Sequence, residues 1–205
     1  MSTIAAGGGG EVRWFIHEPN AVERQLAEQY ALVESIPLLH LRGPLPLDDR
    51  HQVPAGFVTR PFEVGVDEDE WLRVNGRAFA EHPEQSDWTH AVLAQRMAEE
   101  WFDPHGFLLH EIDGRLAGFC WTKVHRTSPP TGEIFVIGVD PAHHGRGLGR
   151  ALTIAGFAHL AAQGMREGML YTLADNTPAI KLYESLGLRL AHHDTVFTGT
   201  VAAAR

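Results

Sequence analysis

The residues best suited to chemistry lie in a glycine-rich stretch between an apolar segment and a helix-like segment. Gly145, Gly147 and Gly149 alternate with other residues there, and Arg146 and Arg150 stand among them. Glycines have no Cβ, so the backbone can approach a ligand closely. The first turn of a following helix offers unpaired N–H groups and the positive end of its dipole, which attract anions. The pattern predicts a binding site for linked phosphate groups.

Three interpretations of this stretch compete. A dinucleotide-binding fingerprint requires a glycine three positions after Gly147, but Arg150 stands there, and no glycine–lysine–serine/threonine phosphate loop is present. A glycine-rich turn that binds nothing is the second interpretation. The third is a loop that holds the pyrophosphate of coenzyme A, and the remainder of the chain supports it.

The segments around the loop alternate between the strand and helix periods, which predicts an α/β domain. After the loop we expect a helix over 148–162, a strand over 169–172, a helix over 178–186 and short strands near Leu188 and over 195–198. Before it we expect a strand over 57–62, a helix from Asp67 with Glu70 in a capping box, a helix over 89–101, a hairpin of strands 107–112 and 116–124, and the strand 134–139, which Asp140-Pro141 ends.

A proline-rich connector divides the chain into two parts. Residues 43–55 form this linker, and a catalytic domain is expected over 56–200. Residues 1–10, which include four consecutive glycines, are expected to be a flexible leader. The segment 11–42 contains a predicted strand, helix and strand, at 12–16, 21–30 and 36–41. We expect this segment to be the end of a second domain.

Composition excludes several classes of function. A net charge of -9 argues against a nucleic-acid partner. No apolar run approaches the ~20 residues that span a bilayer, and no secretory signal is visible, so a soluble, cytoplasmic protein without a membrane partner is expected. Cys120 is the only cysteine and lies among apolar residues, which indicates a structural thiol. The histidine pairs His143-His144 and His192-His193 have no carboxylate at ligand spacing, so no metal is expected.

The glycine-rich stretch resembles the pyrophosphate loop of the GNAT acyltransferase superfamily, whose core is Gln/Arg-x-x-Gly-x-Gly/Ala. Gly147 and Gly149 match this core, and His144 occupies the Gln/Arg position. A run similar to Asn-x-x-Ala-x-x-x-Tyr-x-x-x-Gly follows at Asn176, Ala179, Tyr183 and Gly187. The resemblance implies the GNAT fold, which is a mixed, mostly antiparallel twisted sheet flanked by helices. That sheet would splay between 134–139 and 169–172.

Within that superfamily, residues 119–125 and 132–141 are similar to the C-terminal catalytic half of the mycothiol synthase family. This resemblance implies an acetyl-CoA-dependent N-acetyltransferase that acts on a small-molecule amine by direct transfer in a ternary complex. The family has two GNAT domains, and 11–42 looks like the end of the first one. From this resemblance we expect this sequence to lack most of that first domain.

The same resemblance assigns roles to residues. Glu133 would be the general base, acting through water, and Tyr183 the general acid that protonates the departing thiolate. By strand alternation Glu133 is expected to share a face with Phe135 and Ile137. The remaining assignments place Ile137, Gly138 and Val139 on the thioester carbonyl, His144, Gly145, Arg146, Gly147, Leu148, Gly149 and Arg150 on the pyrophosphate, Asn176, Ala179 and Lys181 on the pantetheine arm, and Lys123, Glu133 and Tyr171 on the acceptor substrate.

Alternatives remain open at each of these positions. Glu133 and Lys123 are also explained as solvated strand-end residues, and Tyr183 as a core tyrosine on an amphipathic helix. Gly138 is expected to permit a distortion of the strand ladder. The alternative acceptors are another amine, an amino acid or a peptide N-terminus. A non-catalytic acyl-CoA-binding module is the alternative from another class, and a homodimer formed through 11–41 is a further hypothesis.

Overall fold

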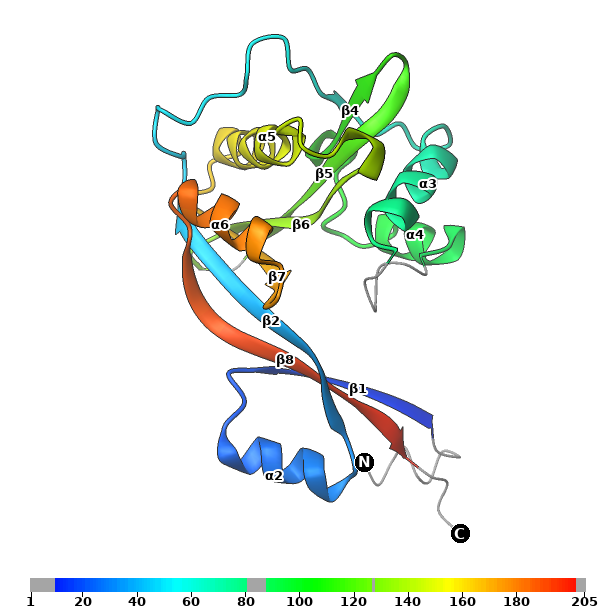
Figure 1. Cartoon of the computed structure of the whole chain (residues 1–205), viewed down its shortest axis with the longest axis vertical. Helices are drawn as coiled ribbons and strands as arrows, with labels where there is room; N and C mark the ends of the chain where they lie inside the picture. The colour runs from blue at the N-terminus through cyan, green and yellow to red at the C-terminus, as the bar shows by residue number, and fades with distance from the viewer. Residues whose placement is uncertain (1–9, 81–87, 127, 202–205) are drawn as a thin grey trace. The chain divides into compact units, whose positions relative to one another are not determined.

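The computed structural model describes residues 10–80, 88–126 and 128–201 (Figure 1). The chain divides into two compact units. Unit 1 comprises Met1–Leu41, Tyr171–Lys181 and Arg189–Arg205, and unit 2 comprises Arg42–Leu170 and Leu182–Leu188. The expected leader over 1–10 lies outside the described residues except for Gly10. No helix within the described ranges is long and apolar enough to cross a membrane.

Unit 2 contains a mixed sheet with the strand order β7-β6-β5-β4-β3. The strands are β3 (Arg60–Pro61), β4 (Phe107–Ile112), β5 (Arg115–His125), β6 (Thr131–Val139) and β7 (Glu167–Leu173), the last of which continues into unit 1. β3, β4, β5 and β6 pair antiparallel in turn, whereas β6 and β7 are parallel. The mixed, mostly antiparallel sheet is therefore confirmed.

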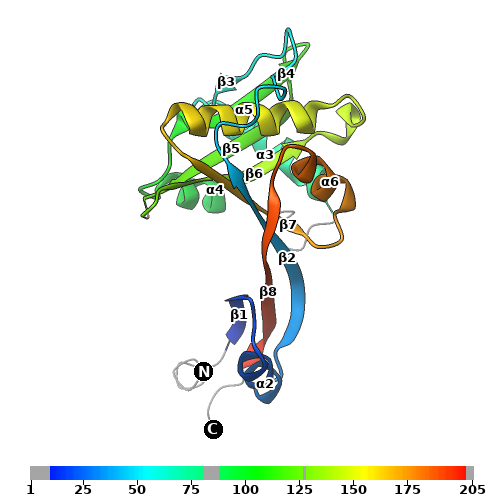
Figure 2. The same cartoon turned by 90° about the vertical axis from the view of Figure 1, so that its left-hand side faces the viewer.

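Helices cover both faces of this sheet. Figure 2 shows α5 (Leu148–Ala162) on one face of β4, β5 and β6, with α3 (Glu68–Ala78) and α4 (His90–Met97) on the other. Under α3 and α4 lies an aromatic core in which Phe107 and Trp121 stack with ring centroids 4.3 Å apart. The short helices η1 (Pro104–Gly106) and η2 (Pro141–His143) also belong to unit 2, and α6 (Thr177–Ser185) is divided between the two units.

Unit 1 is built on three strands in the order β1-β8-β2. They are β1 (Gly10–His17), β8 (Arg189–Val201) and β2 (Val33–Pro44), whose last residues belong to unit 2. α2 (Ala21–Gln29) connects β1 to β2 and begins with a capping box, because Asn20 accepts from the amide of Glu23 and the Glu23 carboxylate accepts from the amide of Asn20. The core of unit 1 consists of apolar residues of β1, α2 and β8, together with Leu32 between α2 and β2.

The helix over 148–162 forms with the predicted bounds, whereas three other predictions about elements are wrong. The strand expected over 57–62 is only the two residues of β3, α4 ends at Met97 instead of Trp101, and one long strand, β8, replaces the two expected closing strands. The two strand errors concern elements whose extent depends on a distant partner strand. β8, for example, pairs with β1 from Asp194 opposite His17 to Val201 opposite Gly10.

The capping box expected at Asp67 is also absent. Asp67 precedes α3 with helical dihedrals, and its side chain makes no cap hydrogen bond. Its carboxylate instead accepts two hydrogen bonds from Arg60, at 2.6 and 2.8 Å, and one from the amide of Glu63 at 2.7 Å. An N-cap side chain reaches its amides from an extended backbone. The charged partner at β3 therefore holds this carboxylate away from the helix end.

Candidate active site

The glycine-rich loop joins the end of β6 to α5 through η2. Gly145 and Gly147 have φ of 75° and 76°, and Gly147 directly precedes α5. A residue with a side chain would pay about 1–2 kcal/mol for this left-handed conformation. A Cβ at either glycine would meet nothing within 4 Å, so the backbone here faces open space. The loop has the open, glycine-lined backbone that an anion at a helix N-terminus requires.

Asp140 anchors the start of this loop, a role that the sequence analysis did not predict. One carboxylate oxygen accepts from the amide of Ala142 and from Arg77, both at 2.9 Å. The other accepts from Arg77 at 3.1 Å and from Arg73 at 3.2 Å. Burial opposes ionisation of Asp140, but the Ala142 amide and the two guanidinium groups outweigh it and lower its pKa. The loop is thereby tied to α3.

Cationic and polar side chains surround the loop. The Arg150 guanidinium lies 2.9 Å from Ser185 Oγ and 2.9 Å from His51 Nδ1. His144 turns its Nε2 back to within 3.1 Å of the Val139 carbonyl oxygen. Beside the loop is a pocket of about 480 Å³, which is lined by Gln52, Pro54, Ala55, Gly56, Phe57, His110, Ile112, Arg146, Gly147, Leu148, Arg150, Ala151 and Ile154. This donor set fits an anionic nucleotide.

β6 carries a bulge, and its position differs from the predicted one. Trp121 of β5 lies opposite Val136, whereas Thr122 lies opposite Ile134, so Phe135 is the extra residue. The distortion expected at Gly138 is therefore at Phe135. At Gly138 a Cβ would come within 2.8 Å of the Phe119 ring, which explains this glycine by close packing.

The parallel pairing of β6 with β7 is short. It joins only Gly132–Ile134 to Gly168–Leu170, while β6 continues beyond it to Val139. The described pairing of β6 with β7 thus ends at the bulge in β6. The backbone of the last residues of β6, which include Ile137, Gly138 and Val139, extends past the paired segment toward the glycine-rich loop.

Glu133 lies on the face of the sheet that α3 and α4 cover. It is 7% exposed and stands opposite Lys123 of β5. Phe135 packs against the aromatic core on this same face. Ile137, in contrast, pairs with Cys120, whose sulfur faces Gly156 of α5. The prediction that Glu133 shares a face with Phe135 is confirmed and the one for Ile137 is wrong, because the bulge changes the alternation.

His125 is a site residue that the sequence analysis missed. Its Nε2 lies 2.5 Å from the Glu133 Oε2, and its side chain is 27% exposed. The sequence feature that could have indicated His125 is its position two residues after Lys123, because residues two apart in a strand point to the same face. Lys123 is held as well, since its ammonium lies 4.6 Å from the centroid of the Trp101 ring and 5.5 Å from that of Phe135.

Tyr183 is buried in unit 2, near the end of α6. It is 6% exposed, and burial, with a smaller contribution from Cys120, raises the pKa of its phenol well above the ordinary value. The hydroxyl therefore stays protonated at neutral pH. Burial also raises the pKa of the Cys120 thiol, in keeping with a structural rather than a nucleophilic cysteine.

The remaining expected site residues belong to unit 1. Tyr171 stacks on the ring of His40, with centroids 4.5 Å apart. Asn176 has a structural role, since its Oδ1 accepts from the amide of Ala179 at 3.3 Å and so caps α6. Lys181 is exposed on α6. Within unit 2, by contrast, Lys123 and Glu133 lie opposite each other on neighbouring strands. The hydrogen bond from Arg150 to Ser185 connects the glycine-rich loop to the C-terminal end of α6.

Comparison with known proteins identifies relatives that cover most of the chain. It is 46% identical over 193 residues to a mycothiol acetyltransferase of Thermobispora bispora, covering 91% of this chain and 65% of that protein. It is 50% identical over 181 residues to a mycothiol acetyltransferase of Thermomonospora curvata, covering 87% and 60%. The chain thus spans somewhat less than two thirds of the length of these two relatives.

Structural comparison agrees with the sequence comparison. The crystal structure of a GCN5-related N-acetyltransferase from Sphaerobacter thermophilus superposes with a TM-score of 0.73 at 23% identity, covering 100% of this chain and 64% of that one. This likeness concerns the fold. The model of the acetyltransferase (GNAT) family matches residues 69–188, which include β4 to β7, the glycine-rich loop and Tyr183. The chain belongs to the acetyltransferase (GNAT) family.

Proposed function

We propose that this chain transfers the acetyl group of acetyl-CoA to the nitrogen of a small-molecule amine. The observation that carries the proposal is the glycine-rich loop, with two left-handed glycines before α5 and Asp140 fixing its start, in a chain of the GNAT family. The loop backbone, with Arg146 and Arg150, would hold the pyrophosphate.

Acetyl-CoA would supply an activated acyl group as a thioester, and the protein's residues would manage protons and charge. An amine with pKa ~8 is mostly protonated at pH 7, so a base must remove one proton before the nitrogen can attack. Glu133 is the base in this proposal. Its bond to His125 gives the proton a route toward solvent, since His125 is partly exposed.

Two further elements would support the transfer step. The backbone N–H groups of Ile137–Val139 would stabilise negative charge on the carbonyl oxygen as the nitrogen adds. When the carbon–sulfur bond breaks, the sulfur leaves as a thiolate, and the Tyr183 hydroxyl would give it a proton. The nitrogen loses its second proton to Glu133 or water as the amide forms. The raised pKa of Tyr183 keeps the proton on the phenol before this step, and the phenolate that the transfer leaves takes a proton back from water.

For the acceptor, we propose the cysteinyl amine of desacetyl-mycothiol or a closely related compound. The support is the name mycothiol acetyltransferase, which relatives at 46% and 50% identity carry. Lys123 would contact this acceptor beside Glu133, with Trp101 and Phe135 fixing its ammonium.

A thiol-release assay with acetyl-CoA and a panel of amines tests this function. The panel contains desacetyl-mycothiol, cysteine, other amino acids, glucosamine and a short peptide. Turnover is expected to be fastest with desacetyl-mycothiol. Faster turnover of a peptide or a free amino acid would contradict the acceptor assignment alone. Binding of acetyl-CoA without turnover of any amine would contradict catalysis and leave an acyl-CoA-binding module.

A further inference from the structure

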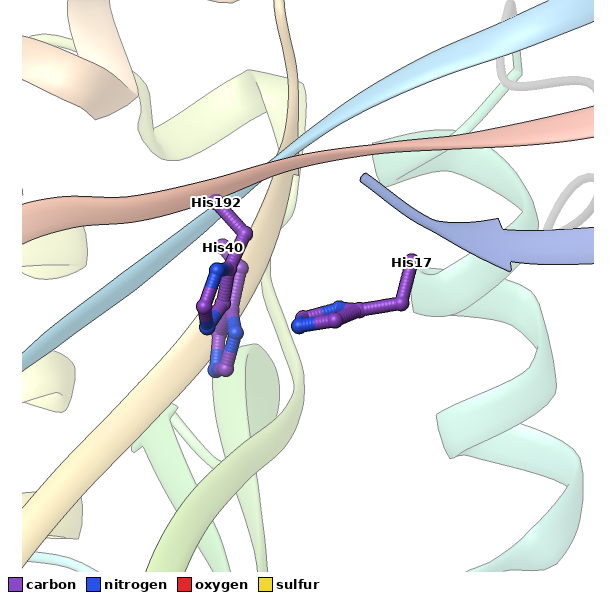
Figure 3. Close-up of side chains that lie close together, drawn as sticks. All are labelled: His17, His40 and His192. Carbon is purple, nitrogen blue, oxygen red and sulfur yellow. The ribbon is translucent and has the colours of Figure 1, made fainter. Parts of the chain in front are cut away.

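Three histidines from three separate strands meet in unit 1 (Figure 3). His17 ends β1, His40 lies on β2 and His192 on β8. One ring nitrogen of each lies within 4.8 Å of those of the other two. The ring centroids of His17 and His192 are 4.0 Å apart, and those of His40 and His192 are 5.3 Å apart. We call these three side chains the histidine cluster.

Strand register explains why the cluster forms. His17 of β1 lies directly opposite Asp194 of β8. His192 is two residues before Asp194, so both point to the same face of β8, while His193 between them points to the other face. The expectation that no metal binds considered only histidines that are consecutive in the sequence. The cluster takes one member of such a pair and joins it to two distant strands.

A carboxylate orients one of the rings. Asp194 is 2% exposed, and its Oδ1 lies 2.8 Å from Nδ1 of His17 and accepts from the amide of Glu18 at 3.3 Å. This contact places the proton of a neutral His17 on Nδ1 and leaves a lone pair on Nε2. In Figure 3 the far end of the His17 ring points toward His40 and His192. A carboxylate behind a ligating imidazole is the usual second layer of a metal site.

His192 supplies an independent observation. Its Nδ1 is buried and makes no hydrogen bond with any described residue, although Glu18 Oε2 lies 3.4 Å away. A buried polar atom without a hydrogen bond is costly and calls for an explanation. A bound cation would explain this nitrogen, because an imidazole nitrogen that carries no proton has a lone pair available to a metal ion.

We propose that His17, His40 and His192 bind a divalent transition-metal ion of the Zn²⁺ type. Imidazole nitrogen is a preferred ligand of such ions, and three of them leave a fourth position for water or for the Glu18 carboxylate. Ligand distances of ~2.0–2.1 Å place tetrahedral nitrogens about 3.3 Å apart. The rings therefore need only small rotations to close around the ion. Such an ion would link β1, β2 and β8 within unit 1.

The test is metal binding by the full, tag-free chain after chelator treatment. Equilibrium dialysis against ZnCl₂ is expected to give one bound ion per chain, and Co²⁺ is expected to give the intense visible absorption of a tetrahedral site. His17→Gln and His192→Gln should weaken Zn²⁺ binding by about 100-fold, and Asp194→Asn by about 10-fold. Saturating Zn²⁺ should raise the Tm of the wild type by about 5 °C.

The matched control is His193→Gln, which removes an exposed histidine from the opposite face of the same strand. It should bind Zn²⁺ as tightly as the wild type. His17 has a half-exposed side chain, so His17→Gln should fold, which circular dichroism verifies. The proposal is overturned if the wild type retains no ion, or if His17→Gln binds as tightly as His193→Gln. Binding alone decides the result, so it is independent of acetyl transfer.

Discussion

At the scale of single residues, Glu133 and His125 form the most specific arrangement in unit 2. The Glu133 carboxyl is 7% exposed and so needs a polar partner, which an imidazole nitrogen of His125 supplies at 2.5 Å. The contact places the Glu133 carboxyl inside the protein and connects it to the partly exposed ring of His125. Lys123, which lies opposite Glu133 on the neighbouring strand β5, adds a cation to the same face of the sheet.

Replacing Glu133 tests its role as the base. Glu133→Gln preserves size but removes the proton acceptor, so we expect kcat to fall by about 10²–10⁴-fold. The affinity for acetyl-CoA should stay nearly unchanged, as calorimetry can measure. Glu34→Gln, at an exposed glutamate of β2, is the control and should keep full activity. Equal kcat in Glu133→Gln and the wild type would remove this residue from the mechanism.

Replacing Tyr183 tests the proton donor. Tyr183→Phe keeps the buried ring and removes only the hydroxyl, so kcat should fall by about 10²-fold in the thiol-release assay. Because burial raises the pKa of Tyr183, its proton is retained as the pH rises through the ordinary phenol value of ~10. No loss of activity below that pH should therefore trace to Tyr183. Tyr30→Phe, at the exposed end of α2, is the control.

The sequence identified candidate residues, but it did not identify the partners that these residues contact. Glu133 and Tyr183 stand out by residue type and by family motif. The contact between His125 and Glu133 depends on the pairing of β5 with β6, and the face of Ile137 depends on a one-residue bulge at Phe135. Neither the contact nor the bulge can be detected from the periodicity of apolar residues in the sequence. The histidine cluster is hidden for the same reason, since its members are far apart in the chain.

At the scale of elements, the turn from β6 into α5 is the decisive structure. The helix dipole and first-turn amides of α5 face the loop, and the loop conformation depends on left-handed glycines. The sequence predicted α5 with its observed bounds, because glycine before a periodic apolar segment is a local signal. It did not predict that Asp140 is held by Arg73 and Arg77, because α3 is more than sixty residues away.

Gly147→Ala tests the loop conformation. Alanine disfavours the left-handed φ by about 1–2 kcal/mol and would project a Cβ into the open space beside the backbone. We expect the Kd for acetyl-CoA to rise about tenfold or more in calorimetry. Gly76→Ala is the matched control, because Gly76 lies in α3 with open space around it. It should stabilise the helix by about 0.5–1 kcal/mol and leave the Kd unchanged.

Asp140→Asn tests the anchor of the loop. The amide side chain loses the charge that holds both arginines, so the loop should become less ordered before the nucleotide binds. We expect the KM for acetyl-CoA to rise about tenfold while kcat changes less, as steady-state kinetics can show. A KM equal to that of the wild type, in a variant with an unchanged Tm, would contradict the anchoring role.

At the scale of the whole molecule, the ion pair between Arg60 of β3 and Asp67 at the start of α3 contributes to the response of stability to acid. Arg60 of β3 donates two hydrogen bonds to Asp67, and this contact outweighs the effect of burial and lowers the pKa of Asp67. A carboxyl whose folded pKa lies below the unfolded value stabilises the protein above the unfolded value of ~3.9. This stability is lost as the pH falls through the lowered folded pKa.

Asp67→Asn should therefore reduce the free energy of unfolding at neutral pH by about 1–2 kcal/mol, a range that allows for the partial exposure of Arg60. The variant should also lose less additional stability than the wild type when the pH falls below ~4. Urea unfolding at several pH values measures both effects. Asp49→Asn, in the exposed connector, should change stability by less than about 0.5 kcal/mol. Matching pH profiles for wild type and Asp67→Asn would contradict this account.

The most direct test of the central claim is equilibrium binding of acetyl-CoA to the full chain. The loop over 144–150 is expected to bind it with a Kd between about 1 µM and 1 mM, and free CoA should compete because it carries the same pyrophosphate. Gly147→Ala should weaken this binding, and Gly76→Ala should not. Folded wild-type protein that binds no acetyl-CoA, or binds it equally well in Gly147→Ala, would contradict the account.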